Sequence, residues 1–147
     1  MLADLHSVRR VFVLIRPKKR ADGVVVSALE RLEEFFEESV FDSLRATPEA
    51  FAAARGKVVA ITGAVSLPGL GISAEQRQQL EAEVDTIFNS AATVVFDEPL
   101  DVSLKTNTNG PLELLELARS CLKNVDFIHI STAYVNGQLT EIGRAHV

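Results

Sequence analysis

Apolar runs alternate with amphipathic stretches along most of the chain. Four short runs, rich in aliphatic and aromatic residues, predict buried strands at Val11–Ile15, 58–61, Thr86–Asn89 and 127–130. Between them, residues 27–44, 73–83 and 100–122 have helical spacing, and a shorter helix is expected after Thr47. Because continuously apolar strands alternate with helices, the pattern predicts an α/β fold, a doubly wound parallel sheet with helices on both faces.

Signals for the ends of these helices are also present. Ser73, followed three residues later by Gln76, has the capping-box pattern of a helix start. Pro111 falls inside the stretch 100–122 and predicts either a bend or a new helix after Gly110. The stretch 27–44 carries an apolar residue every three or four positions, at Leu29, Leu32, Phe36, Val40 and Leu44, which predicts one continuous helix. Within 100–122, five leucines are available for packing: Leu104, Leu112, Leu115, Leu117 and Leu122.

Composition narrows the functional classes. The 147 residues are 47% hydrophobic and 24% charged, as in one ordinary globular domain. A net charge of -5 argues against nucleic acid or an anionic membrane as a partner. Cys121 is the only cysteine, which favours a reducing compartment on the cytoplasmic side. The apolar stretch Val11–Ile15 is too short to be a membrane segment.

Candidate chemistry lies where the strands end, since parallel sheets bind ligands at the carboxyl ends of their strands. The first strand runs into a basic segment that starts at Arg16 and includes Lys19 and Arg20. An arginine at the end of a strand in a dinucleotide site accommodates the 2′-phosphate of NADP through charge-assisted hydrogen bonds. The alternative is a basic turn that is simply solvated.

The other strand ends carry small or hydroxyl residues. Ser90, Ala91 and Ala92 follow the third strand and would let a cofactor lie against the backbone, although an ordinary strand exit has the same composition. Ser131 and Thr132 follow the last strand, where a hydroxyl can polarise a substrate carbonyl.

Other polar residues favour structural roles. Asn107 fits a hydrogen-bonding residue of the core, His129 a packed core residue, and Cys121 a buried helix residue. The three histidines do not form a metal-like cluster, so no metal site is expected. Acidic pairs such as Asp97 and Glu98 have no spacing that points to glycosidase chemistry.

Four segments together resemble the fatty acyl-CoA reductases, the male sterility family of extended short-chain dehydrogenase/reductases. They are VFVLIRPKK (residues 11–19), LPGLGIS (67–73), NSAATVVFDEPL (89–100) and HISTAYVNG (129–137), in the order and at the spacing of the family. The resemblance covers nearly all of the chain up to Thr140 and implies a Rossmann-type NADP-binding domain.

The resemblance implies reduction of a long-chain acyl-CoA by NADPH to a primary alcohol, in two hydride transfers through an aldehyde-level intermediate. Thr132 matches the hydroxyl member of the family's catalytic Thr/Ser–Tyr–Lys set, and Ser131 is its neighbour. Tyr134, also in that motif, does not match the catalytic tyrosine.

The remaining matches concern the cofactor. The resemblance places Ala64 and Val65 at the cofactor and Ala91 with Ala92 beneath it, while Asn107 supports the active-site backbone. The chain departs from the family at Ala64, which stands in place of a usual acidic residue that contacts adenine. It departs also at Asn89, where the family commonly has histidine.

Parts of the family pattern are missing from the sequence. It contains no Gly-x-x-Gly-x-x-Gly turn and no Tyr-x-x-x-Lys pair, and residues 1–10 resemble only the tail of a helix. We therefore expect residues 1–140 to be a partial NADP-binding domain without its first strand, and the 147-residue chain itself to be marginally stable and inactive. The sheet should show either a gap or a non-standard pairing between residues 11–16 and 86–90. Residues 141–147 resemble a translated sequencing adapter and are interpreted as a non-native tail.

Two other interpretations stay open. The same motifs occur in the terminal thioester-reductase domain of carboxylic acid reductases and of peptide or polyketide synthetases. A non-catalytic Rossmann module that binds NADP is the alternative from a different class.

Overall fold

Four parallel strands form the centre of the molecule. The computed structural model describes residues 7–95 and 97–132. Strand β1 (Val11–Ile15) pairs with β4 (Val58–Thr62), and β5 (Thr86–Asn89) pairs with β6 (Asp126–His129). Both pairs are parallel, so the predicted α/β fold with parallel strands is confirmed, and each strand lies where an apolar run predicted it.

The two strand pairs are separate two-stranded sheets. No ladder joins them within residues 7–95 and 97–132, so of the two outcomes predicted for residues 11–16 and 86–90 the structure has the gap and not the non-standard pairing. Apolar packing holds the two pairs together instead. The core around Ile61, Leu70, Leu80 and Leu117 also takes in Leu14 from β1 and Ile87 from β5.

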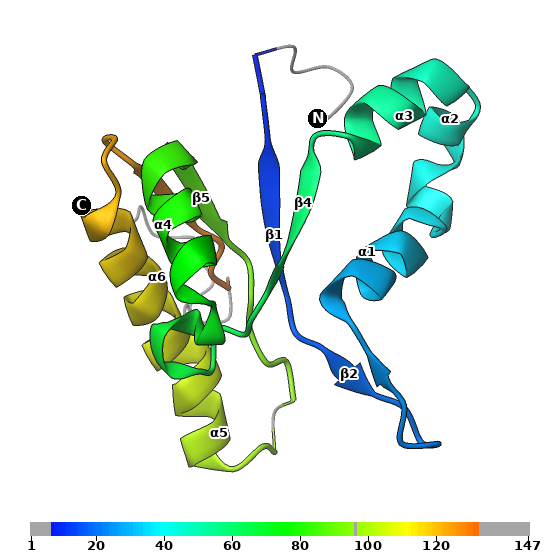
Figure 1. The fold of residues 1–147 in the computed structure, drawn as a ribbon. Coiled ribbons are helices and arrows are strands. Elements are labelled where there is room, and N and C mark those ends of the chain that lie inside the picture. The colour runs from blue at the N-terminus through cyan, green and yellow to red at the C-terminus, as the bar shows by residue number, and fades with distance from the viewer. Residues whose placement is uncertain (1–6, 96, 133–147) are drawn as a thin grey trace, which may run out of the picture.

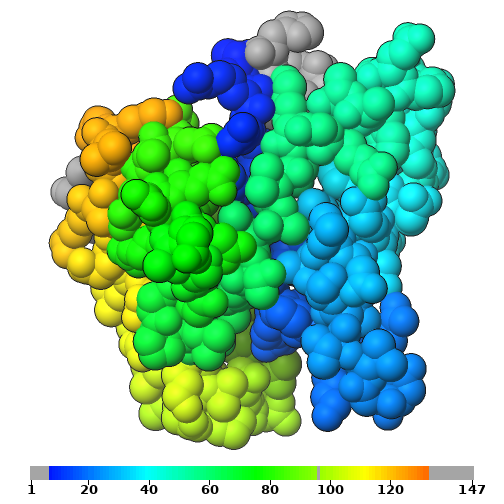
Figure 2. All heavy atoms as spheres, viewed as in Figure 1, coloured from blue at the N-terminus to red at the C-terminus, as the bar shows by residue number. Residues whose placement is uncertain are grey.

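Helices cover both sides of β1 and β4, as the doubly wound pattern predicted (Figure 1). On one side lie α1 (Ala28–Phe36), a 3₁₀ turn η1 (Ser39–Phe41), α2 (Asp42–Arg45) and α3 (Pro48–Arg55). On the other side lie α4 (Ala74–Glu83), α5 (Leu100–Leu104) and α6 (Gly110–Ser120). Figure 2 shows the two groups of helices as separate flanks of the molecule. No helix in the described part of the chain is long and apolar enough to cross a membrane.

Helix α1 is shorter than the sequence predicted. One helix was expected over residues 27–44, but α1 ends at Phe36 and Glu38 is extended, with ψ 148°. Val40 is consequently 71% exposed rather than buried. The ring of Phe36 packs against Phe41 and Phe51, with centroids 5.2 Å and 5.9 Å away, and the break lets the chain fold back to make these contacts.

The predicted helix over 100–122 is divided by a π-helical turn, η3 (Lys105–Asn109). The amide of Gly110 donates to the carbonyl of Lys105, and α6 starts at Gly110, as the proline predicted. Pro111 has no amide hydrogen for an α-helical bond, so a wider turn before it is tolerated. Not every leucine that was available for packing is buried, since Leu112 and Leu122 are more than half exposed.

Helix α4 and one hairpin complete the fold. The capping box predicted for α4 is present, since Ser73 Oγ accepts from the amide of Gln76 and the Gln76 side chain accepts from the amide of Ser73. A small antiparallel hairpin, β2 (Lys18–Lys19) with β3 (Val25–Val26), follows β1 and was not predicted. It turns at Gly23, whose φ is +87°.

Candidate functional site

A cavity of about 480 Å³ lies at the carboxyl ends of β1, β4 and β5, which is within the size range of ligand pockets. We call it the strand-end cavity. Its lining comes from the three strand ends and from the segment that leads into α5 and η3. The lining residues are Leu14, Arg16, Gly63, Ala64, Val65, Ser66, Ala92, Thr93, Val94, Val95, Glu98, Val102 and Thr106. Four residues predicted to contact the cofactor therefore meet here: Arg16, Ala64, Val65 and Ala92.

The exit of β4 is shaped by a loop in the left-handed conformation. Gly69, Leu70 and Gly71 have φ of +59°, +63° and +61°. Leu70 is 1% exposed, so burial of its side chain offsets the cost of a left-handed backbone at a non-glycine residue. The carbonyl of Leu70 accepts a 2.8 Å hydrogen bond from the amide of Ala64, which fixes Ala64 in the cavity wall.

Helix α6 holds this loop in place. The carboxylate of Glu113 accepts a hydrogen bond from the amide of Gly69, with an N–O distance of 2.9 Å. Gly110, at the start of the same helix, lies against Val65, and a Cβ there would be 3.0 Å from the Val65 Cβ. Two contacts with one helix therefore set the position of residues 64–71 relative to β5.

Two asparagines organise the exit of β5. Asn89 is 2% exposed, and its Oδ1 accepts from the amide of Ala91 at 3.2 Å. Asn107, in η3, forms hydrogen bonds with both the amide and the carbonyl of Thr93. Its Oδ1 accepts from the Thr93 amide at 2.9 Å, and its Nδ2 donates to the Thr93 carbonyl at 3.4 Å. Since Thr93 lines the strand-end cavity, Asn107 supports the wall of the cavity without lining it.

The basic segment after β1 contributes one residue to the cavity. Arg16 lines it, and the Arg16 carbonyl is held by the guanidinium of Arg31 on α1. Lys19, also predicted at the cofactor, is exposed in hairpin strand β2 and is not among the lining residues. Arg20 pairs with Glu34 at 2.6 Å. Arg16 is thus the only basic side chain that the described lining contains.

Glu98 lies in the family-like segment 89–100 and lines the cavity, but the sequence predicted no site role for it. It is the only acidic side chain among the lining residues of the described structure. Its Oε2 is buried and has no hydrogen-bond partner in the described part of the chain. No residue spacing marks this position, because Glu98 lies in an irregular segment between β5 and α5.

The remaining predicted residues are not among those that line the cavity. Ser90 and Ala91 are exposed after β5, and Ser131 and Thr132 are exposed after β6. The amide of Ile130 donates to the carbonyl of Asn89 at 2.9 Å, which places Ser131 directly after the end of the β5–β6 ladder. Tyr134 lies outside the described residues.

His129 and Cys121 differ from their predicted environments. His129 was expected in the core, but it is exposed, and its Nδ1 lies 3.0 Å from Asn89 Nδ2. Cys121 is half-buried at the end of α6 rather than buried within it, and its Sγ donates to the Leu117 carbonyl at 3.3 Å. Burial raises the pKa of the Cys121 thiol, with a smaller contribution from the Glu81 carboxylate. Among the residues that the structure describes, no three His, Cys, Asp or Glu side chains lie together as a metal site.

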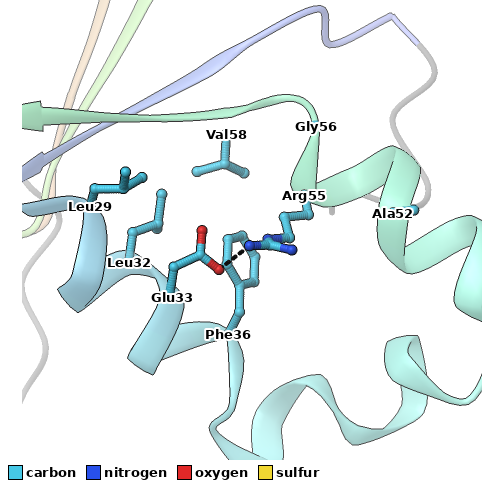
Figure 3. A pocket seen from close by; sticks show the side chains of 8 residues that line it. All are labelled: Leu29, Leu32, Glu33, Phe36, Ala52, Arg55, Gly56 and Val58. Atoms are coloured by element: carbon cyan, nitrogen blue, oxygen red, sulfur yellow. Dashed lines mark hydrogen bonds and ion pairs between the residues drawn. The ribbon is translucent and has the colours of Figure 1, made fainter.

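A second cavity, of about 350 Å³, lies between α1, α3 and the start of β4 (Figure 3). Leu32 and Phe36 of α1 and Val58 of β4 point into it, and Arg55 forms an ion pair with Glu33 beside them. It holds none of the predicted site residues. Because it lies at the amino end of β4, it is on the wrong edge of the sheet for the usual ligand site.

Comparison with known proteins shows the family to which the chain belongs. The sequence model of an NAD-binding family described as "Male sterility protein" matches residues 1–146. This chain belongs to the male sterility family. It is 34% identical to fatty acyl-CoA reductase wat of Drosophila melanogaster over 141 residues, which are 96% of this chain and 26% of that protein. It is 36% identical over 134 residues to the chloroplastic fatty acyl-CoA reductase 2 of Arabidopsis thaliana, covering 89% of this chain and 21% of that protein.

Solved structures of reductase domains have the same fold as this male sterility chain. The terminal R domain of the myxalamid PKS-NRPS pathway superposes with a TM-score of 0.63 at 28% identity, covering 91% of this chain and 31% of that one. The reductase domain of a nonribosomal peptide synthetase from Mycobacterium tuberculosis superposes with a TM-score of 0.58 at 28% identity, covering 86% of this chain and 27% of that one. The chain spans about a quarter of the length of the curated relatives it matches.

Proposed function

We propose that this chain forms the cofactor-binding part of an NADPH-dependent reductase that converts a long-chain acyl-CoA to a primary fatty alcohol. The observation that carries the proposal is the strand-end cavity, which combines one arginine, Arg16, with the small residues Ala64 and Ala92. Membership of the male sterility family and the acyl-CoA reductases among its relatives support the reaction.

The residues present fit the adenosine end of NADPH. Arg16 offers a planar, permanently charged group that can form two parallel hydrogen bonds to a phosphate. Ala64 and Ala92, which follow β4 and β5, have no side chain beyond Cβ, which leaves room for a cofactor against the backbone. The unpartnered Oε2 of Glu98 adds an acceptor to a cavity that is otherwise mostly apolar. This combination suits an aromatic base that carries a sugar phosphate.

The proposed roles of the other residues rest on the family resemblance. When bound, NADPH supplies the hydride. Thr132, after β6, donates its hydroxyl hydrogen to the substrate carbonyl oxygen, which draws electron density away from the carbon that accepts the hydride. Asn107 keeps Thr93 in place, and Ser90 with Ala91 continues the surface along which the cofactor lies.

Replacement of Arg16 tests the cofactor assignment. We expect Arg16→Leu to weaken NADPH binding about ten- to a hundred-fold while leaving NADH binding unchanged, because a hydrogen bond to a charged group is worth roughly 1.5–3 kcal/mol. The enhancement of NADPH fluorescence on binding measures this directly, and the chain has no tryptophan to interfere.

Arg20→Leu is the matched control, since Arg20 belongs to the same basic segment but pairs with Glu34 outside the cavity. It should leave the preference for NADPH over NADH intact. Equal binding of NADPH and NADH by the unaltered chain, or an equal effect of both substitutions, would contradict the assignment.

The similarity to R domains of synthetases favours a second candidate, a thioester reductase whose acyl group arrives on a carrier protein. The two candidates share the cofactor and differ in the thiol that carries the acyl chain. Reduction assays with a protein of the relatives' length separate them, by supplying the same acyl group either on CoA or on a phosphopantetheinylated carrier protein.

A further inference from the structure

Glu98 lies in the wall of the strand-end cavity, and one of its carboxylate oxygens has no hydrogen-bond donor in the described part of the chain. Its Oε2 is buried, and none of the ion pairs or hydrogen bonds in the described part of the chain involves it. Buried carboxylate oxygens are almost always paired, because an ionised carboxylate loses its hydration and can only accept hydrogen bonds. A donor from a ligand in the cavity would satisfy this oxygen.

The walls around Glu98 are apolar and accessible. Val94 is 82% exposed and Val95 is 54% exposed, although both line the cavity, and Val102 is on the same wall. Ala64 and Val65 line it from β4. Exposed valines beside a small-residue wall fit the faces of a flat aromatic ring better than they fit a phosphate or a sugar.

The two charged side chains of the lining indicate which groups a ligand must carry. Arg16 is the only cation of the lining, at the end of β1, and Glu98 is its only anion, in the segment before α5. A ligand that satisfies both must have an anionic group for Arg16 and an N–H or O–H donor for Glu98, joined through a ring that contacts the valines. A phosphorylated adenosine has these three features, since the 6-amino group of adenine provides two N–H donors at the edge of the ring.

We propose that Glu98 is the residue that recognises adenine, by accepting a hydrogen bond from its 6-amino group while Arg16 holds the ribose phosphate. This inference rests on the proposed binding of NADPH. The terminal torsion of a glutamate side chain is broad, so a small rotation turns the buried oxygen toward the cavity. Ala64 has no hydrogen-bonding side chain, which leaves Glu98 as the one carboxylate available to the base in the described lining.

Calorimetric titration of the purified chain with the adenosine half of the cofactor tests the inference. The probes are adenosine 2′,5′-bisphosphate and inosine 2′,5′-bisphosphate, which differ only in the base edge. Inosine presents a carbonyl oxygen to Glu98 where adenosine presents an amino group. We expect the adenosine compound to bind about ten- to a hundred-fold more tightly, the range for a hydrogen bond to a charged group.

Three variants isolate the contact. Glu98→Ala should bind the adenosine compound more weakly and reduce the adenosine-to-inosine ratio to about one. Glu98→Gln should also bring the ratio close to one, because an amide can both accept from the amino group and donate to the carbonyl. The matched control Asp97→Asn, at the exposed neighbouring carboxylate, should keep the ratio of the unaltered chain.

The outcomes distinguish this inference from the proposed function. Preference for NADPH over NADH combined with equal binding of the adenosine and inosine probes overturns the role of Glu98 and leaves the cofactor assignment standing. Retention of the full ratio in Glu98→Ala and Glu98→Gln does the same. The 3′,5′-bisphosphates are the CoA-like isomers of the probes. If the adenosine-to-inosine binding ratio depended on Glu98 for the 3′,5′ isomers but not for the 2′,5′ isomers, the assignment of the site to NADPH would be overturned.

Discussion

The fit of Gly63 against the left-handed loop predicts a large effect for a single methyl group. Gly63 follows β4, and a Cβ added there would be 2.4 Å from the carbonyl oxygen of Leu70 and 2.7 Å from Cδ1 of Leu14. The Leu14 side chain can move, but the Leu70 carbonyl belongs to a loop fixed by Ala64 and Glu113. The Gly63→Ala variant must therefore displace backbone.

The cost can be worked out from these contacts. Relief of the overlap requires a shift of the Leu70 carbonyl that breaks its hydrogen bond from Ala64. Overpacking costs about 1–3 kcal/mol and the lost hydrogen bond about 1 kcal/mol. The lower backbone entropy of alanine in the unfolded chain returns about 0.4–1 kcal/mol. We expect a net destabilisation of roughly 2–3 kcal/mol.

Urea unfolding followed by far-UV circular dichroism measures this effect, since the chain has no tryptophan for fluorescence. With a slope of about 1–3 kcal/mol per molar urea, the midpoint should fall by about 0.7–3 M. Gly56→Ala is the control, because Gly56 has an ordinary helical φ of -62° and a Cβ there would lie 3.3 Å from the Ala52 carbonyl oxygen. Equal midpoints for the two variants would refute the close packing inferred at Gly63.

Two further predictions concern Asn107 and Cys121. Replacing Asn107 by alanine removes both hydrogen bonds to Thr93, so the Thr93 amide hydrogen should exchange faster with deuterium. The control Asn109→Ala should leave this exchange rate unchanged. An unchanged rate in Asn107→Ala would show that Asn107 does not hold the cavity wall. Because burial raises the pKa of the Cys121 thiol, iodoacetamide should alkylate it more slowly in the folded chain than in urea at pH 8.5. Equal alkylation rates in the folded chain and in urea would contradict the burial. Because the pKa of the thiol is higher in the folded chain, the neutral thiol stabilises the fold at pH values below the unfolded-state pKa. This contribution is lost as the pH rises through the folded-state pKa.

The strands and α4 could be predicted because their signals are local. The run of Val11–Ile15 is bounded by polar residues and by Pro17, and Ser73 with Gln76 marks the start of α4. The single helix predicted over 27–44 failed for a non-local reason, since periodicity does not reveal that Phe36 packs on Phe51 of another helix.

The error at His129 has a different cause. An apolar strand in a parallel sheet is expected to be covered on both faces. In the described structure Ile128, His129 and Ile130 are all exposed, and since successive strand residues point to opposite faces, neither face is fully covered at this end of the strand. The apolar pattern was therefore detected correctly, while the burial inferred from it was wrong for this strand.

The site could be predicted in part from the sequence. Carboxyl ends of parallel strands meet at one edge, so Arg16, Ala64 and Ala92 could be grouped from the sequence. Glu98 could not, because it lies nine positions after Asn89 in a segment without periodicity. Only the three-dimensional structure reveals that Glu98 lines the same cavity and that its Oε2 is buried without a partner in the described part of the chain.

The register of the β1–β4 pair has a consequence for synthesis on the ribosome. Val11 pairs with Val58, which is 47 positions later in the chain. At about 5–20 residues per second, strand β1 emerges roughly 2–9 seconds before the residues it pairs with. Closing a short loop takes well under a microsecond, so translation rather than diffusion sets this delay. During that interval the apolar segment VFVLI is available to any extended chain nearby, and a chaperone that covers it would protect the nascent protein.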